Sequence, residues 1–147
     1  NIFMISLRNV THESFSDDKN IIANAIIDSQ RSLADKMNRS WEDMFVQPYC
    51  LAISTDTVKR LASLGIYAET HTAGSWRVIE HSFIKFPGSG EANNELIADG
   101  TWGQFIPPEL LYLGEPKVLT GTRTQVARAA TLYGVPNNRQ YTSLWLR

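Results

Sequence analysis

The chain has little cysteine: Cys50 is the only one among its 147 residues. A single cysteine cannot form an internal disulfide, so a disulfide-stapled fold is excluded, and so is a zinc site built on paired cysteines. The three histidines do not have the pair spacing of a metal hydrolase, and no carboxylate cluster accompanies them. We therefore expect neither a metal nor a cofactor.

The chain also lacks long apolar runs and an excess of one charge. No run is long enough to cross a bilayer, and no basic and then apolar segment opens the chain, so we expect neither a membrane span nor a signal peptide. The net charge of −1 disfavours nucleic acid and anionic membranes as partners. Four arginines gather near the C-terminus, where we expect a solvated charged face: Arg123, Arg128, Arg139 and Arg147.

Repeats and low-complexity tracts are absent, and the length and the hydrophobic content of 43% predict one domain, residues 1–147, with a buried core. The chain begins at Asn1 rather than Met, which is consistent with a domain excised from a longer protein. Four tryptophans and five tyrosines leave open a protein-binding surface, although core packing accounts for most aromatic residues.

The hydrophobic pattern predicts two helices, then strands, then a helix. Residues 14–37 and 50–65 carry apolar side chains at helical spacing, and Gly65 is a natural stop for the second helix. A last helix is predicted over residues 120–136. Three strands separated by turn-forming residues are predicted at 66–71, 76–86 and 94–98. This order predicts an α+β fold, with N-terminal helices packed on an antiparallel β-sheet.

Cys50 is a candidate nucleophile because the pattern places it at the start of a helix. The unpaired N–H groups at a helix N-terminus stabilise a thiolate, and they also stabilise the oxyanion that forms when a thiolate attacks an acyl carbon. The alternative is a small buried hydrophobic side chain, which is the usual role of a free cysteine.

A thiol whose pKa is near the ordinary value of about 8.5 needs a base. His81 lies within a predicted strand on the same face as Phe83, whereas His12 falls in a polar loop and His71 beside a predicted turn. Asp99 ends the next apolar run, so a hairpin would return it toward His81, where a carboxylate holds the second ring nitrogen of a catalytic imidazole. The structural alternatives are a hydrogen-bonded sheet histidine and an Asp-Gly turn.

The order Cys50, His81, Asp99 is that of papain-like enzymes, whose catalytic residues meet in space rather than in sequence. The segment HSFIKF…ELIADGTWGQF resembles the His and Asp motifs of the transglutaminase-like branch of the papain fold, over roughly residues 47–105. It is most similar to the compact papain-fold domains of bacterial toxins and effectors, several of which deamidate glutamine side chains of host proteins. Around the cysteine, VQPYCLA departs from the pattern usual in these families.

The resemblance implies a papain-like core and a role for each of six residues. It implies Cys50 as nucleophile, His81 as general base and acid, Asp99 as the residue that orients the imidazole, Gln47 in the oxyanion hole, Trp102 as a shield of the His–Asp contact, and Gln104 as a support of the loop. The alternatives are a solvated loop amide for Gln47, a core anchor for Trp102 and a direct role in the reaction for Gln104.

The function that the resemblance implies is a cysteine hydrolase that works through a thioester on a protein substrate. Deamidation of glutamine side chains is the favoured reaction, and proteolysis and transglutamination share its steps. The resemblance also implies a secreted or translocated effector that acts in the cytosol of a target cell without a visible signal peptide. A non-catalytic protein-binding module on the same fold is the alternative from another class.

Overall fold

The computed structural model describes residues 6–46, 49–74, 80–110 and 116–146. Its centre is a four-stranded antiparallel sheet with the strand order β3-β4-β5-β6. These strands are β3 (Glu69–Gly74), β4 (Glu80–Lys85), β5 (Leu96–Asp99) and β6 (Leu119–Thr122). A separate parallel pair joins β1 (Arg8–Asn9) to β2 (Ile66–Tyr67). The expected α+β class and the antiparallel sheet are confirmed.

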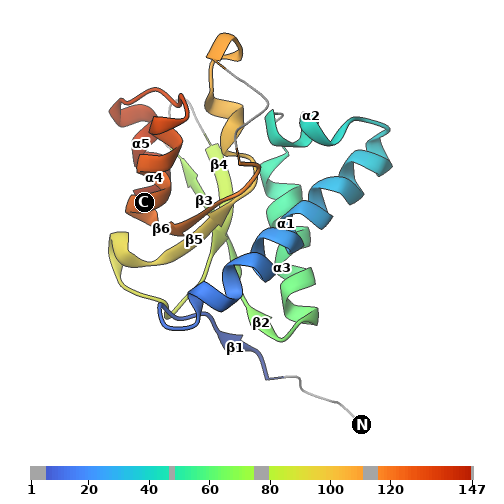
Figure 1. The fold of residues 1–147 in the computed structure, drawn as a ribbon, viewed down its shortest axis with the longest axis vertical. Helices are drawn as coiled ribbons and strands as arrows, with labels where there is room; N and C mark the ends of the chain where they lie inside the picture. The colour runs from blue at the N-terminus through green and yellow to red at the C-terminus, as the bar shows by residue number, and fades with distance from the viewer. Residues whose placement is uncertain (1–5, 47–48, 75–79, 111–115, 147) are drawn as a thin grey trace.

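Helices cover both faces of the sheet (Figure 1). One face packs against the N-terminal helices α1 (Phe15–Met37) and α3 (Cys50–Ser63), and the short helix α2 (Trp41–Val46) packs against α1. The other face packs against α4 (Arg123–Leu132) and α5 (Arg139–Leu146). Three short 3-10 turns lie in the connections: η1 (Ala92–Asn94), η2 (Trp102–Phe105) and η3 (Pro108–Leu110). The expected helical cover therefore holds for one face, and the C-terminal helices add a second layer.

Alternation along β4 divides the core into two clusters. Ile84 packs in the cluster that contains Ile22 and Ile26 of α1, whereas Phe83 packs in the cluster that contains Val126 of α4. Both clusters are buried, so β4 is covered on both faces. His81 shares the face of Phe83 because side chains two positions apart point the same way.

The register of the β4–β5 hairpin brings Asp99 near His81. Ile84 pairs with Ala98 and Lys85 with Ile97. Continuing this register sets Asp99 opposite Phe83, two positions from His81 on the same face, a diagonal that long side chains can bridge. The structure therefore contains the predicted hairpin, with a register that brings Asp99 close to His81.

Two predicted boundaries are wrong. The predicted helix over 120–136 starts at Arg123, because residues 119–122 pair with β5 as a strand and Thr122 then forms a capping box with Gln125. The turn predicted after His71 is also absent: β3 continues to Gly74, and His71 pairs with Phe83 inside the sheet. The helices α2 and α5 have no counterpart in the sequence prediction.

Arg123 corrects the expectation of a solvated C-terminal face. It is 6% exposed, and its guanidinium bonds to Glu95, whereas Arg128 and Arg139 are exposed. Arg147 lies outside the described residues. Among the residues that are described, no helix has both the length and the apolar character that a bilayer span requires. The same residues contain no group of three or more acidic, His or Cys side chains placed to hold a metal ion.

Candidate active site

The fold brings Cys50, His81 and Asp99 together from three elements. Cys50 is the first residue of α3 and is half-buried; His81 lies in β4 and Asp99 ends β5, and both are almost fully buried. His81 Nε2 is hydrogen-bonded to Asp99 Oδ2. The His81 side chain lies within hydrogen-bonding reach of the Cys50 thiol. Since Nε2 is engaged by the carboxylate, the thiol meets the Nδ1 side of the ring, which Gln104 Nε2 also approaches at 2.7 Å.

The surroundings of Cys50 favour the thiolate. Partial burial is the largest single influence and by itself raises the pKa of the thiol. Hydrogen bonds from His81 and from the backbone N–H of Ser82, together with the charge of His81, lower the pKa and outweigh both the burial and the opposing charge of Asp99. The net pKa of Cys50 is below its ordinary value, which is the condition for a reactive cysteine.

The surroundings of His81 favour the imidazolium. Burial is the largest influence and lowers the pKa of the ring, but the charge and hydrogen bond of Asp99, and then those of Cys50, raise it to about 9. A lowered thiol pKa beside an imidazole pKa raised to about 9 favours the thiolate–imidazolium form of the pair over the neutral form.

Asp99 is held by donors on both carboxylate oxygens. Oδ1 accepts from the backbone N–H of Thr101 at 2.9 Å, and Oδ2 accepts from the indole N–H of Trp145 at 2.8 Å in addition to its bond with His81. A buried carboxylate is costly unless its oxygens are satisfied in this way. The donors therefore fix the orientation in which the carboxylate meets the imidazole.

The turn after Asp99 is held close to α1. The carbonyl of Gly100 accepts from Gln30 Nε2 at 2.6 Å, and a Cβ at Gly100 would come within 2.3 Å of Ile26 Cγ2. Any residue larger than glycine would push the turn away from α1, so the Asp99-Gly100 dipeptide serves close packing as well as chain reversal.

The Gln104 side chain contacts the His81 ring directly. Its Nε2 is 2.7 Å from His81 Nδ1. A carboxamide can present its nitrogen to a neutral Nδ1 or its oxygen to a protonated one, so it can follow either protonation state of the ring. Phe105, the next residue, packs edge-on against the His81 ring with centroids 4.8 Å apart.

Trp102 is fully buried in the core rather than against the His81 ring. Its ring contacts Phe45 and Tyr133, with centroids 5.2 and 5.4 Å away, and its indole N–H donates to the carbonyl of Pro116 at 3.3 Å. The described rings that contact His81 are those of Phe83, Phe105 and Trp145. Gln47, the expected oxyanion-hole residue, lies outside the described residues.

Sequence reasoning missed Phe105 and Trp145 as neighbours of His81. Phe105 directly follows Gln104, a residue already assigned to the site, and this adjacency could have indicated that Phe105 lies near His81. Trp145 gave no such signal, because it is 46 positions from Asp99 in the chain and only the packing of α5 brings it back.

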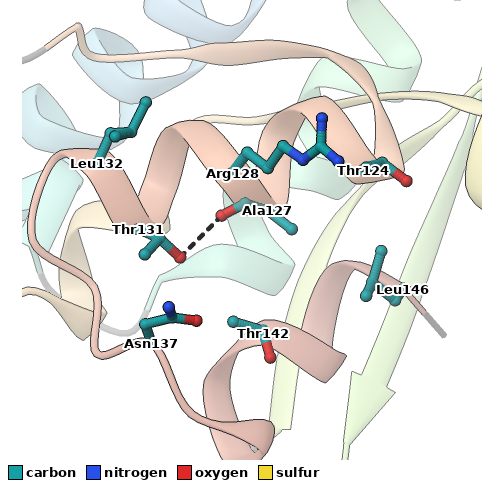
Figure 2. A pocket seen from close by; sticks show the side chains of 8 residues that line it. All are labelled: Thr124, Ala127, Arg128, Thr131, Leu132, Asn137, Thr142 and Leu146. Atoms are coloured by element: carbon teal, nitrogen blue, oxygen red, sulfur yellow. Dashed lines mark hydrogen bonds between the residues drawn. The ribbon is translucent and has the colours of Figure 1, made fainter.

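A pocket of about 460 Å³ lies between α4 and α5 (Figure 2). The residues Cys50, His81 and Asp99, here called the triad, do not line it. Its wall is partly apolar, with Leu132 and Leu146 at the surface. The lining residues are Thr124, Ala127, Arg128, Thr131, Leu132, Asn137, Thr142 and Leu146. This pocket is therefore separate from the candidate active site.

Fold and site together define an α+β protein with a Cys–His–Asp constellation at the junction of a helix N-terminus and an antiparallel sheet. Comparisons with protein-family models, with curated proteins and with solved structures found no significant match. The function is therefore inferred from the geometry of the site.

The two shifted groups make a prediction about stability and pH. His81 has a folded-state pKa of about 9 against an ordinary 6.5, so its contribution is fully present below pH 6.5 and is lost as the pH rises through 9. Cys50 has a folded-state pKa below its ordinary value, so its contribution is present above the ordinary value and is lost as the pH falls through the folded-state pKa. Between the folded-state pKa of Cys50 and pH 9 the two slopes oppose each other.

We therefore expect Cys50→Ser to reveal the slope of His81. Urea unfolding of the variant should give a free energy of unfolding that falls as the pH rises from 6.5, whereas that of the unmodified protein should change less over the same window. Parallel curves for the two proteins would contradict the thiolate–imidazolium assignment.

Proposed function

We propose that this protein is a cysteine-dependent amide hydrolase that deamidates glutamine side chains of a protein substrate. The observation that carries the proposal is the joint placement of the Cys50 thiol, the His81 imidazole and the Asp99 carboxylate, with a lowered thiol pKa and a raised imidazole pKa. Shifts in opposite directions within one cluster are typical of a nucleophile and its acid–base partner.

The reaction begins with attack of the Cys50 thiolate on the carbon of a glutamine carboxamide. The oxyanion that forms is stabilised by N–H groups at the start of α3, the positive end of the helix. The His81 imidazolium gives its Nδ1 proton to the leaving nitrogen, ammonia departs, and a thioester remains on Cys50. Neutral His81 then takes a proton from water, which attacks the thioester and releases glutamate and the free cysteine.

Asp99 keeps the imidazole in the orientation that this cycle needs. Because the carboxylate engages Nε2, the same nitrogen, Nδ1, serves first as acid and then as base. The choice of deamidation over peptide cleavage, and of an effector that acts inside a target cell, follows the resemblance of HSFIKF…ELIADGTWGQF to papain-fold toxin domains.

The test is mass spectrometry of candidate protein substrates incubated with the protein and with its Cys50→Ala variant. With the unmodified protein, we expect a gain of about one mass unit at glutamine of the substrate, with release of ammonia and no new chain termini. With the Cys50→Ala variant, we expect neither change. New termini would instead indicate a protease, and a gain of the mass of an added primary amine would indicate a transglutaminase. Equal products with both proteins would contradict catalysis by Cys50.

A further inference from the structure

We propose that Trp145 in the C-terminal helix α5 is a positioning residue of the triad, which acts on Cys50 through Asp99 and His81. The inference rests on the proposed function, since it assigns a residue to the same site. The indole Nε1–H of Trp145 donates to Asp99 Oδ2 at 2.8 Å, and the same oxygen bonds to His81 Nε2. Trp145 is fully buried and Asp99 is 1% exposed, so bulk water does not replace this donor.

The indole N–H is one of few donors to a carboxylate that the fold encloses. Thr101 supplies the other oxygen with its backbone N–H at 2.9 Å, and its hydroxyl lies 3.4 Å away. Without the indole donor, Oδ2 would be held by His81 alone among the described side chains. The carboxylate could then rotate about its side-chain bond, and its hold on the imidazolium would weaken.

The fold fixes the tryptophan as firmly as it fixes the carboxylate. The carbonyl of Trp145 accepts from Arg123 Nη1 at 3.1 Å, and the other side of the Arg123 guanidinium bonds to Glu95. The Trp145 ring also stands edge-on to His81 and to Phe105, with centroids 6.1 and 6.2 Å away. The backbone and the ring of Trp145 are thus both anchored, which is what a precise donor to a catalytic carboxylate requires.

The experiment measures the thiol pKa of Cys50 from the pH dependence of alkylation by iodoacetamide in Trp145→Phe. The variant keeps an aromatic ring and removes the N–H donor. We expect the thiol pKa to rise by about one unit, so that alkylation near pH 6 slows about tenfold, because a hydrogen bond to a charged group is lost from the triad. An unchanged profile would overturn the inference.

Trp41→Phe is the matched control. Trp41 also donates its indole N–H to a side chain, Gln30 Oε1 at 2.9 Å, and makes no direct bond to Cys50, His81 or Asp99. Gln30 binds the Gly100 carbonyl through its nitrogen, and that bond does not use the Trp41 donor. The same chemical change there should leave the alkylation profile of Cys50 unchanged. An equal shift in both variants would attribute the effect to general loosening of the fold and would overturn the inference.

A double-mutant cycle with Asp99→Ala tests whether Trp145 acts on Cys50 through Asp99 or through a general change of structure. If Trp145 acts through Asp99, Trp145→Phe should no longer change the thiol pKa once Asp99→Ala is present. A shift of the same size in both backgrounds would overturn the inference. Should Trp145→Phe fold poorly, benzothienylalanine at position 145 keeps the shape of the ring and lacks only the donor, and it should reproduce the shift.

The unmodified protein distinguishes failure of this inference from failure of the proposed function. An ordinary thiol pKa for Cys50 in the unmodified protein would contradict the proposed function itself. A lowered thiol pKa that Trp145→Phe does not change would contradict the role of Trp145 and leave the proposed function in place.

Discussion

His81→Ala should slow alkylation of Cys50 at pH 6.5 and reduce amide hydrolysis by about 10²-fold or more. The imidazole is the hydrogen-bond partner and the cation that lower the thiol pKa, so its removal raises the thiol pKa and reduces the fraction of thiolate at that pH. At pH 10 the alkylation rate should approach that of the unmodified protein, because Cys50 is then ionised without help. The measurement is the mass of the carbamidomethylated protein against time at several pH values.

His12→Ala is the control for this experiment. His12 lies in an exposed segment, where its Nε2 is 2.9 Å from the carbonyl of Asn94, and Cys50 has no contact with it among the described interactions. Its removal should leave the alkylation of Cys50 unchanged. If His81→Ala behaved like His12→Ala at pH 6.5, His81 would not be the base.

Arg123→Ala should lower the free energy of unfolding by about 3 kcal/mol, the lower end of the range for a buried pair, because it leaves the partly buried carboxylate of Glu95 without its partner. The Arg123 side chain is 7% exposed and that of Glu95 is 16% exposed, and they meet at 2.6 Å. The same change also removes the donor to the carbonyl of Trp145 in α5. Urea unfolding at neutral pH measures the loss.

Arg60→Ala is the matched control for the stability measurement. Arg60 pairs with Asp56 at 2.7 Å, but both side chains are more exposed than those of the Arg123–Glu95 pair, at 38% and 43%. Screening by water limits such a pair to about 1 kcal/mol or less. Equal losses for Arg60→Ala and Arg123→Ala would contradict the structural role assigned to the buried pair.

The helical and strand patterns predicted the helix that begins at Cys50 and the two strands that contain His81 and Asp99. The helix predicted over 50–65 appears as α3, which begins at Cys50, because apolar spacing and Gly65 fix its position locally. The hairpin prediction also brought Asp99 toward His81, because a strand that follows a turn runs back along its neighbour. The long turn left the register open in the sequence, and the pairing of Ile84 with Ala98 defines it. The catalytic roles assigned to these residues remain predictions.

Long-range packing accounts for what the sequence did not reveal. Residues 119–122 form a strand because β5 offers a pairing edge, which overrides the helical pattern that follows. Arg123 is buried because Glu95 and the carbonyl of Trp145 neutralise and bind its guanidinium, and these partners are 28 and 22 positions away in the chain. Trp145 reaches Asp99 only after α5 has packed on the sheet, so no local pattern could identify it.

The most direct test of the account is the thiol pKa of Cys50 in the folded, unmodified protein. Cys50 is the only cysteine in the chain, so thiol alkylation with iodoacetamide as a function of pH reports on this site alone. We predict an apparent thiol pKa below the ordinary value of a cysteine, with alkylation near neutral pH faster than that of a model thiol. A thiol pKa at or above that value, with slow alkylation near neutral pH, would contradict it.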